Sequence, residues 1–163
     1  MPDEHAFGVE LLTPESALFT GAATAVICRT SAGDLTVLDG HTPLVGDVTP
    51  GVVRVEVEGA TERYCVHGGF LQVRTEAGAA TGLLGDADAT TRSTRVTVLA
   101  GVAEPVAGID VARAQAARDA AASQLESLPA DESDPEVQAR RRNLEGALAR
   151  AELRLESAGV SVA

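Results

Sequence analysis

The sequence predicts an α+β fold in two parts, an N-terminal antiparallel β-sandwich or flattened barrel and a C-terminal antiparallel hairpin of two helices. Apolar residues alternate with polar ones before Gly108, and they recur at three- and four-residue spacing after it. Hydrophobic residues make up 45% of the chain, which is enough for a packed core. We therefore expect a β-sandwich domain over residues 1–107 and an α-helical hairpin over residues 108–163.

Strand patterns are short and closely spaced through the first part of the chain. In Val52–Glu58, three valines on one face alternate with Arg and Glu on the other, and Gly59 and Ala60 predict a turn into a returning strand at Thr61–His67. Further strands are expected at residues 8–12, 25–30, 35–38, 70–74 and 95–99, separated by turns that contain Gly or Pro. Many short strands joined by such turns predict an antiparallel sandwich or flattened barrel.

The segment from about residue 75 to residue 94 fits the strand pattern poorly. It is rich in Ala, Gly, Thr and Asp, and its only large apolar pair is Leu83-Leu84. We therefore expect a long loop or hairpin insertion over about residues 75–94.

The helical part begins at Asp110, whose carboxylate suits an N-cap because it accepts hydrogen bonds from the first turn. An apolar stripe follows, formed by Val111, Ala114, Ala117, Ala121, Leu125 and Leu128. Asp134 and Pro135 restart a helix after a polar break, since Asp caps and Pro suits the first helical position. The second stripe contains Val137, Arg141, Leu144, Leu148, Ala151 and Leu155, and Gly159 ends it.

The charge balance argues against several classes of partner. The chain has 24 acidic residues against 13 basic ones, all of them Arg, and its formal net charge is −11. Such a surface repels nucleic-acid phosphates and anionic lipids. No stretch approaches the roughly 20 apolar residues that cross a bilayer, so we expect no direct membrane insertion.

Enzyme and metal functions have one weak candidate. Cys65 and His67 lie two apart on a predicted strand and share a face, which leaves open a small hydrolase centred on Cys65 or a pair of metal ligands. No third ligand stands at metal-site spacing, and no nucleophile elbow occurs. We therefore expect no catalytic residue and no metal site.

A series of short motifs follows a recognisable order along the chain. They are Leu12–Glu15, Leu18–Gly21, Gly33–Val45, Pro50-Gly51, Gly68–Val73, Val96–Ala100, Ala103-Glu104 and Ile109–Ala114. This order resembles the epsilon subunits of F-type ATP synthases. Asp39 stands where that family usually has Pro, and the segment at 75–94 is far longer than the family's usual tight turn.

The resemblance implies a non-catalytic subunit of the central stalk, or rotor, on the cytoplasmic face of the bacterial membrane. Family members bind the gamma subunit through one face of the sandwich and the c-ring at its base, and they couple proton flow to ATP synthesis. Asp34 and His41 stand at the positions of the family's rotor-contacting loops. The hairpin would contact the catalytic alpha and beta subunits, regulating ATP hydrolysis by changing its arrangement.

The resemblance also implies a regulatory ATP site, although no cofactor is required. Some bacterial members bind ATP through a motif that here comprises Ile109, Asp110, Arg113 and Ala114, helped by an acidic residue, Glu104, and two basic residues of the last helix, Arg150 and Arg154. Three guanidinium groups suit a triphosphate, because each can form bidentate hydrogen bonds. The simpler interpretation is that Asp110 only caps its helix and that the two late arginines pair with neighbouring glutamates.

One other function remains open on the residues alone. A ligand-binding β-sandwich adaptor could use the same helical hairpin to bind an unrelated protein. Co-purification discriminates the two, because an epsilon subunit forms a defined complex with a coiled-coil rotor subunit.

Overall fold

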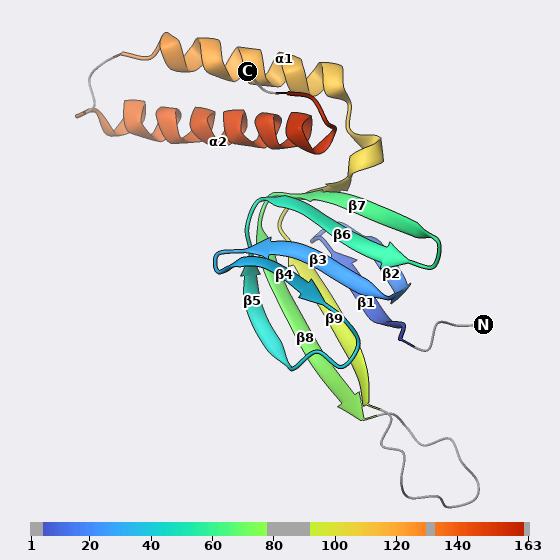
Figure 1. Ribbon diagram of the computed structural model, residues 1–163. Helices are drawn as coiled ribbons and strands as arrows, with labels where there is room; N and C mark the ends of the chain where they lie inside the picture. The colour runs from blue at the N-terminus through green and yellow to red at the C-terminus, as the bar shows by residue number, and fades with distance from the viewer. Residues whose placement is uncertain (1–4, 78–91, 130–132, 162–163) are drawn as a thin grey trace, which may run out of the picture. The chain divides into compact units, whose positions relative to one another are not determined.

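The computed structural model describes residues 5–77, 92–129 and 133–161, and the chain divides into two compact units, Met1–Pro105 and Val106–Ala163. Within the described residues, the first unit holds ten strands and the second holds a short 3₁₀ helix, η1, at Val106–Gly108 and two α-helices (Figure 1). The boundary expected after residue 107 lies inside η1. The predicted β-sandwich followed by two helices is confirmed.

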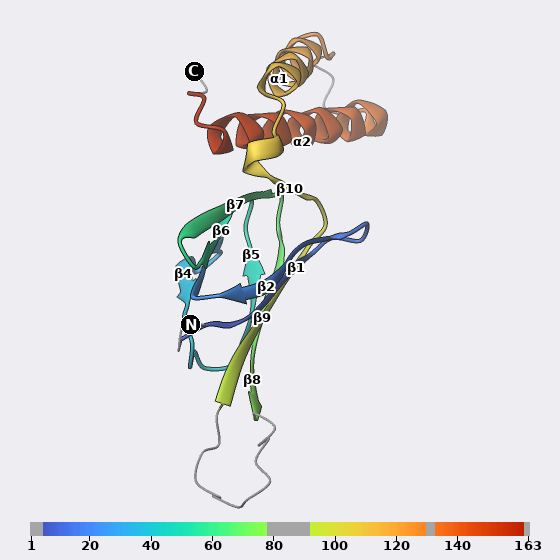
Figure 2. The same cartoon turned by 90° about the vertical axis from the view of Figure 1, so that its right-hand side faces the viewer.

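The first sheet, sheet A, has the strand order β2-β1-β9-β8-β5. Its strands are β1 (Phe7–Leu12), β2 (Ala17–Ala23), β5 (Leu44–Val48), β8 (Gly69–Ala77) and β9 (Arg92–Ala100). Figure 2 shows β1, β9 and β8 side by side. The β1–β9 pair is parallel, while the other pairs of this sheet are antiparallel. Sheet A is therefore antiparallel except for the β1–β9 pair.

The second sheet, sheet B, has the order β10-β7-β6-β3-β4 and is antiparallel throughout. Its strands are β3 (Ala25–Thr30), β4 (Gly33–Val37), β6 (Gly51–Val57), β7 (Ala60–Val66) and β10 (Ala103–Pro105). The predicted turn between β6 and β7 contains Gly59 with φ +76°, a conformation that glycine adopts without steric cost.

The inner faces of the two sheets meet in one core made mostly of valine. Successive side chains of a strand point to opposite faces, so the alternating apolar residues of each strand all face this core. The fully buried large side chains of this core are Val9, Leu11, Val26, Val37, Val53, Val55, Val66, Leu71, Val73, Val96 and Val98. A core of this size, with side chains contributed by both sheets, fixes the register of the strands that carry the surface residues.

Strands β8 and β9 are longer than the sequence indicated. The expected loop or insertion at 75–94 is partly wrong, because residues 75–77 and 92–94 pair with each other as a continuation of the β8–β9 hairpin. Thr75 and Thr94 supply the β-branched side chains that suit a strand. The rest of the expected insertion, residues 78–91, lies outside the described residues.

The second unit is an antiparallel hairpin of α1 (Val111–Glu126) and α2 (Pro135–Ser157). Asp110 and Asp134 are the N-caps, as predicted, and Gly159 follows α2 with φ +81°. The described buried residues of the helices are Ala114, Ala121, Ala151, Leu155 and Ser157. Val111 and Ala117, expected in the apolar stripe, are exposed.

Candidate functional site

Asp34 lies in β4, beside the β3–β4 turn, which hydrogen bonds to Asp47 of β5 hold in place. Both the backbone N–H and the hydroxyl of Ser31 donate to the Asp47 carboxylate, at 3.0 and 2.7 Å. These hydrogen bonds lower the pKa of Asp47 below its ordinary value of 3.8. Asp34 itself is exposed and lies 3.7 Å from the Arg29 guanidinium, a surface ion pair of small energetic weight. The turn is therefore fixed while the Asp34 carboxylate stays open to a partner.

His41 lies in the connection between β4 and β5. Its backbone N–H donates to the Leu38 carbonyl at 3.1 Å, and its ring Nδ1 lies 2.8 Å from the Thr42 carbonyl oxygen. Gly40 precedes it with φ +78° and donates its N–H to the Thr94 hydroxyl at 2.8 Å. The imidazole is half-buried and held within a defined turn.

The structure does not bring Asp34 and His41 together. Asp34 stands near the first residue of β4, and His41 follows its last residue. A strand rises about 3.3 Å per residue, so the length of β4 separates them. The two side chains therefore lie toward opposite ends of β4.

Sheet A carries an exposed apolar row on its outer face that the sequence reasoning missed. Phe70 on β8 pairs with Leu99 on β9, which pairs in turn with Leu12 on β1. The exposed fractions of Phe70 and Leu99 are 63% and 51%. We call Phe70, Leu99 and Leu12 the apolar row. The consecutive apolar pairs Phe70-Leu71 and Val98-Leu99 could have revealed it, because in a strand one member of each pair must face outward.

A mostly apolar hollow adjoins one end of this row. Its volume is about 430 Å³, and it is lined by Leu12, Thr13, Pro14, Leu99, Ala100 and Gly101. Leu12 and Leu99 line this hollow, and the exposed Phe70 pairs with Leu99 on the neighbouring strand. The outer face of sheet A is therefore suited to bind a protein surface.

The hairpin brings together most of the residues expected to bind ATP. Since α1 and α2 are antiparallel, the start of α1 lies beside the end of α2 (Figure 1). This end carries Ile109 and the N-cap Asp110 just before the first helix, Arg113 and Ala114 in that helix, and Arg150 and Arg154 in the second. The expected nucleotide motif and the two late arginines thus share one end of the hairpin.

The contacts of these residues differ. The Asp110 carboxylate accepts the Arg113 backbone N–H at 2.9 Å, while the Arg113 side chain is exposed. The Arg150 guanidinium folds over Gly146, where an added Cβ would lie 3.1 Å from its Nη1. Ala114 is buried as a packing residue. Glu104 belongs to the other unit, in β10 opposite Cys65.

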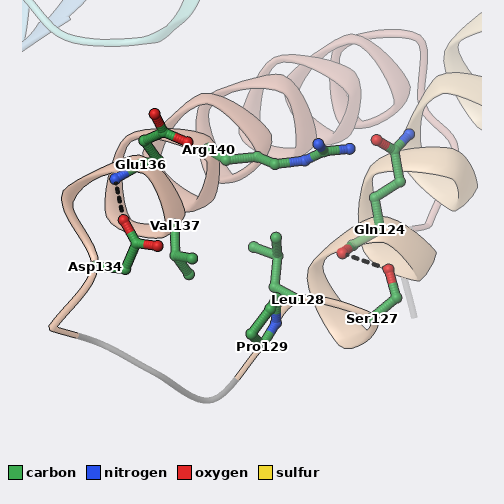
Figure 3. Close-up of a pocket in the computed structure, with 8 residues that line it drawn as sticks. All are labelled: Gln124, Ser127, Leu128, Pro129, Asp134, Glu136, Val137 and Arg140. Carbon is green, nitrogen blue, oxygen red and sulfur yellow. Dashed lines mark hydrogen bonds between the residues drawn. The ribbon is translucent and has the colours of Figure 1, made fainter.

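A second hollow, of about 360 Å³, lies at the opposite end of the hairpin (Figure 3). It is lined by Gln124, Ser127, Leu128, Pro129, Asp134, Glu136, Val137 and Arg140. Arg140 extends toward Gln124, and Asp134 accepts the Glu136 N–H at 2.8 Å. None of the residues expected to bind ATP is among those that line it.

Cys28 and Cys65 are both buried, free cysteines with different neighbours. Cys65 Sγ lies 3.9 Å from His67 Nε2. Burial raises the pKa of the Cys28 thiol to about 11, which keeps it protonated at neutral pH.

Over residues 5–77, 92–129 and 133–161, no three His, Cys, Asp or Glu side chains gather as metal ligands would. In the same part of the chain, neither helix is both long and apolar enough to span a bilayer.

Comparison with known proteins gives consistent matches. Residues 6–77 match the family described as the beta-sandwich domain of the ATP synthase Delta/Epsilon chain. The ATP synthase epsilon chain of Alkalihalophilus pseudofirmus is 35% identical over 126 residues, which cover 77% of this chain and 81% of that protein. The epsilon chain of Bacillus velezensis is 34% identical over 151 residues, covering 93% of this chain and 96% of that one.

A solved structure extends the likeness to nearly the whole chain. A chain in the Euglena gracilis mitochondrial ATP synthase structure (OSCP/F1/c-ring in rotational state 1) aligns with a TM-score of 0.67 and 26% identity. The alignment covers 97% of this chain and 83% of that one, so it includes strands and helices alike. With this fold and these relatives, the chain belongs to the family of ATP synthase epsilon chains, non-catalytic subunits of that enzyme.

Proposed function

We propose that this chain is a subunit of the ATP synthase central stalk, in which the outer face of sheet A binds the gamma subunit. The exposed apolar row supports this proposal most directly. Phe70 and Leu99 stand on a sheet whose inner face already forms the core, so their exposure serves no packing within the sandwich. Large exposed apolar side chains on neighbouring strands are typical of a surface that a partner covers.

Binding to purified gamma subunit tests this face. Phe70→Ser should weaken binding by about 30-fold or more, because truncating a central aromatic anchor typically costs at least 2 kcal/mol. Its effect on folding should stay small, since Phe70 is largely exposed. Ile27→Ser, at a half-buried apolar residue on the outer face of sheet B, is the control and should bind as the native chain does. Equal gamma binding by the native chain and Phe70→Ser would contradict the assignment.

The proposal assigns Asp34 and His41 to contacts with the polar loops of the c-ring. Asp34 lies beside a turn that hydrogen bonds to Asp47 hold, and His41 lies in a turn that a hydrogen bond to Thr94 holds. Side chains on rigid turns are favourable contact points. Together with gamma binding, these contacts would couple proton flow to ATP synthesis from a peripheral position on the cytoplasmic face of the membrane.

The helical hairpin is assigned the regulatory role. The hairpin is a compact unit separate from the sandwich, and its buried residues are mostly small. Both features support a second arrangement of modest energetic cost. In that arrangement the hairpin would reach the alpha and beta subunits and oppose hydrolysis. A chain truncated after Ala107 should keep a folded sandwich and bind gamma. If the truncated chain is unfolded, the division into two functional parts is wrong.

ATP is the proposed regulatory ligand, held at the end of the hairpin by Asp110, Arg113, Arg150 and Arg154, with Ile109 and Ala114 completing the motif. ATP would stabilise the arrangement that binds it more tightly, and only by that difference in affinity. Calorimetric titration should show binding to the native chain, with strong losses in Arg113→Ala and Arg150→Ala. Arg142→Ala, an exposed arginine farther from that end of α2, is the control. Absence of heat with the native chain would remove the nucleotide site and leave the rotor role standing.

A further inference from the structure

The turn that carries His41 is closed by a hydrogen bond from a distant strand. Within the turn, the His41 N–H donates to the Leu38 carbonyl, and Gly40 adopts φ +78°. The Gly40 N–H is not used inside the turn. It donates to the Thr94 hydroxyl at 2.8 Å, across 54 residues of sequence.

Thr94 is a polar residue at a core position. It is 2% exposed and lies on the inner face of β9, in line with the buried Val96 and Val98. A buried hydroxyl lowers stability unless it forms a hydrogen bond, and valine would fill the same volume without that requirement. The bond from Gly40 therefore accounts for a threonine at this position.

The position exists because the β8–β9 hairpin is long. Thr94 pairs with Thr75 in the part of the hairpin that lies beyond residues 74 and 95. This extension of the hairpin brings the Thr94 hydroxyl to the Gly40 amide.

We propose that Thr94 is a positioning residue, which holds the Gly40–His41 turn in the shape in which His41 meets the c-ring. This inference rests on the proposed c-ring contact of His41. Thr94 fixes the backbone before His41, and the Thr42 carbonyl, 2.8 Å from Nδ1, orients the ring after it. A side chain ordered before binding loses less conformational entropy when the partner arrives.

The structural part of the proposal is tested in the full chain by amide hydrogen exchange. Thr94→Val removes the hydroxyl and keeps the shape, so the Gly40 amide should exchange about five- to tenfold faster, the equivalent of one ordinary hydrogen bond. The nitrogen chemical shifts of the His41 ring should change as well. Thr94→Ser keeps the hydroxyl and should restore both measurements toward native values. Unchanged Gly40 exchange in Thr94→Val would overturn the proposal.

Thr75→Val is the matched control, because Thr75 is the direct cross-strand partner of Thr94 but its side chain is exposed. It changes the same pair of strands, so it reports any general effect on the hairpin. Gly40 exchange and the His41 ring shifts should remain native in this variant. A Thr75→Val effect equal to that of Thr94→Val would also overturn the proposal, since the cause would then be the hairpin as a whole.

The functional part is tested by the affinity of the same variants for purified c-ring, with His41→Ala as reference. Thr94→Val should bind about two- to tenfold more weakly, while Thr94→Ser and Thr75→Val bind as the native chain does. Native affinity in Thr94→Val together with weakened binding in His41→Ala would overturn the positioning role and leave the c-ring contact in place. Native affinity in His41→Ala would instead show that the contact itself is wrong, and the positioning role would fall with it.

Discussion

The sandwich and the helical hairpin differ in the range over which their residues are connected. The sandwich is tied across long sequence distances, as where Thr24 donates to Glu56 and Gly40 donates to Thr94. The cap bonds of the hairpin join near neighbours, from Arg113 to Asp110 and from Glu136 to Asp134. The buried side chains differ as well, being mostly valine and leucine in the first unit and mostly alanine in the second. We therefore expect the sandwich to unfold as a whole and the hairpin to change without it.

The largest expected effect comes from a cavity in the sandwich core. Leu71→Ala should lower the free energy of unfolding by about 2–5 kcal/mol, because Leu71 is fully buried among side chains from both sheets. Urea denaturation followed by near-UV absorption of Tyr64, which lies in the same core, measures it. The loss should appear in the transition of the sandwich.

Leu155→Ala is the matched change in the hairpin, where Leu155 is the large side chain among the described buried residues of α2. It should lower the helical circular dichroism at denaturant concentrations that leave the Tyr64 signal native. One common transition for both signals, shifted equally by the two variants, would show that the units are not separable.

The helix caps give a smaller effect that sharpens the comparison. Asp110→Ala should destabilise the hairpin by about 1 kcal/mol, since it removes the acceptor for the Arg113 N–H. Asp134→Ala should act similarly through the Glu136 N–H. Thermal melting of the helical signal measures both, and the transition of the sandwich should stay in place.

Asp110→Ser separates the cap from the proposed nucleotide contact. Serine keeps a side-chain oxygen for the Arg113 N–H but lacks the charge, so stability should remain near native while ATP affinity falls. Native ATP affinity in Asp110→Ser would mean that the carboxylate serves the helix alone, as the simpler interpretation of the sequence holds.

The same contrast explains what could be predicted from sequence. Asp110, Asp134-Pro135 and Gly159 define the hairpin through rules that involve only neighbouring residues, and the structure confirms them. Strands β2, β5 and β10 escaped prediction because Gly21, Gly46 and Pro105 weaken their local patterns, while pairing with distant strands stabilises them.

The candidate site shows the same limit. The sequence resemblance identified His41 as a candidate contact residue. The hydrogen bond from the Gly40 N–H to the Thr94 hydroxyl, which holds the turn of His41, joins residues 54 positions apart and could not be predicted in this way. The apolar row likewise arises only when β1, β8 and β9 lie side by side. Contacts of this kind follow from tertiary pairing, which local propensity does not specify.

The smallest expected effect is a change in the stability of the sandwich at low pH. Hydrogen bonds from Ser31 lower the folded-state pKa of Asp47 below 3.8, its ordinary value and that expected for the unfolded chain. A lowered folded pKa means that the stabilisation is fully present above about pH 4 and is lost as pH falls through the folded pKa. Asp47→Asn should therefore be less stable than the native chain at neutral pH, and the difference should shrink as pH drops below about 4.

Thermal melts of both proteins from pH 7 to pH 2.5, with the two signals followed separately, measure this difference. Because the Asp47–Ser31 contact joins β5 to the β3–β4 turn, the pH-dependent difference should appear in the sandwich transition and leave the helical signal of the hairpin unchanged. A difference that stays constant down to pH 2.5 would mean that the charge of Asp47 contributes nothing. A shift in the hairpin transition would mean that the turn beside Asp34 is linked to the helices, and the separation of the two units would then fail at this point.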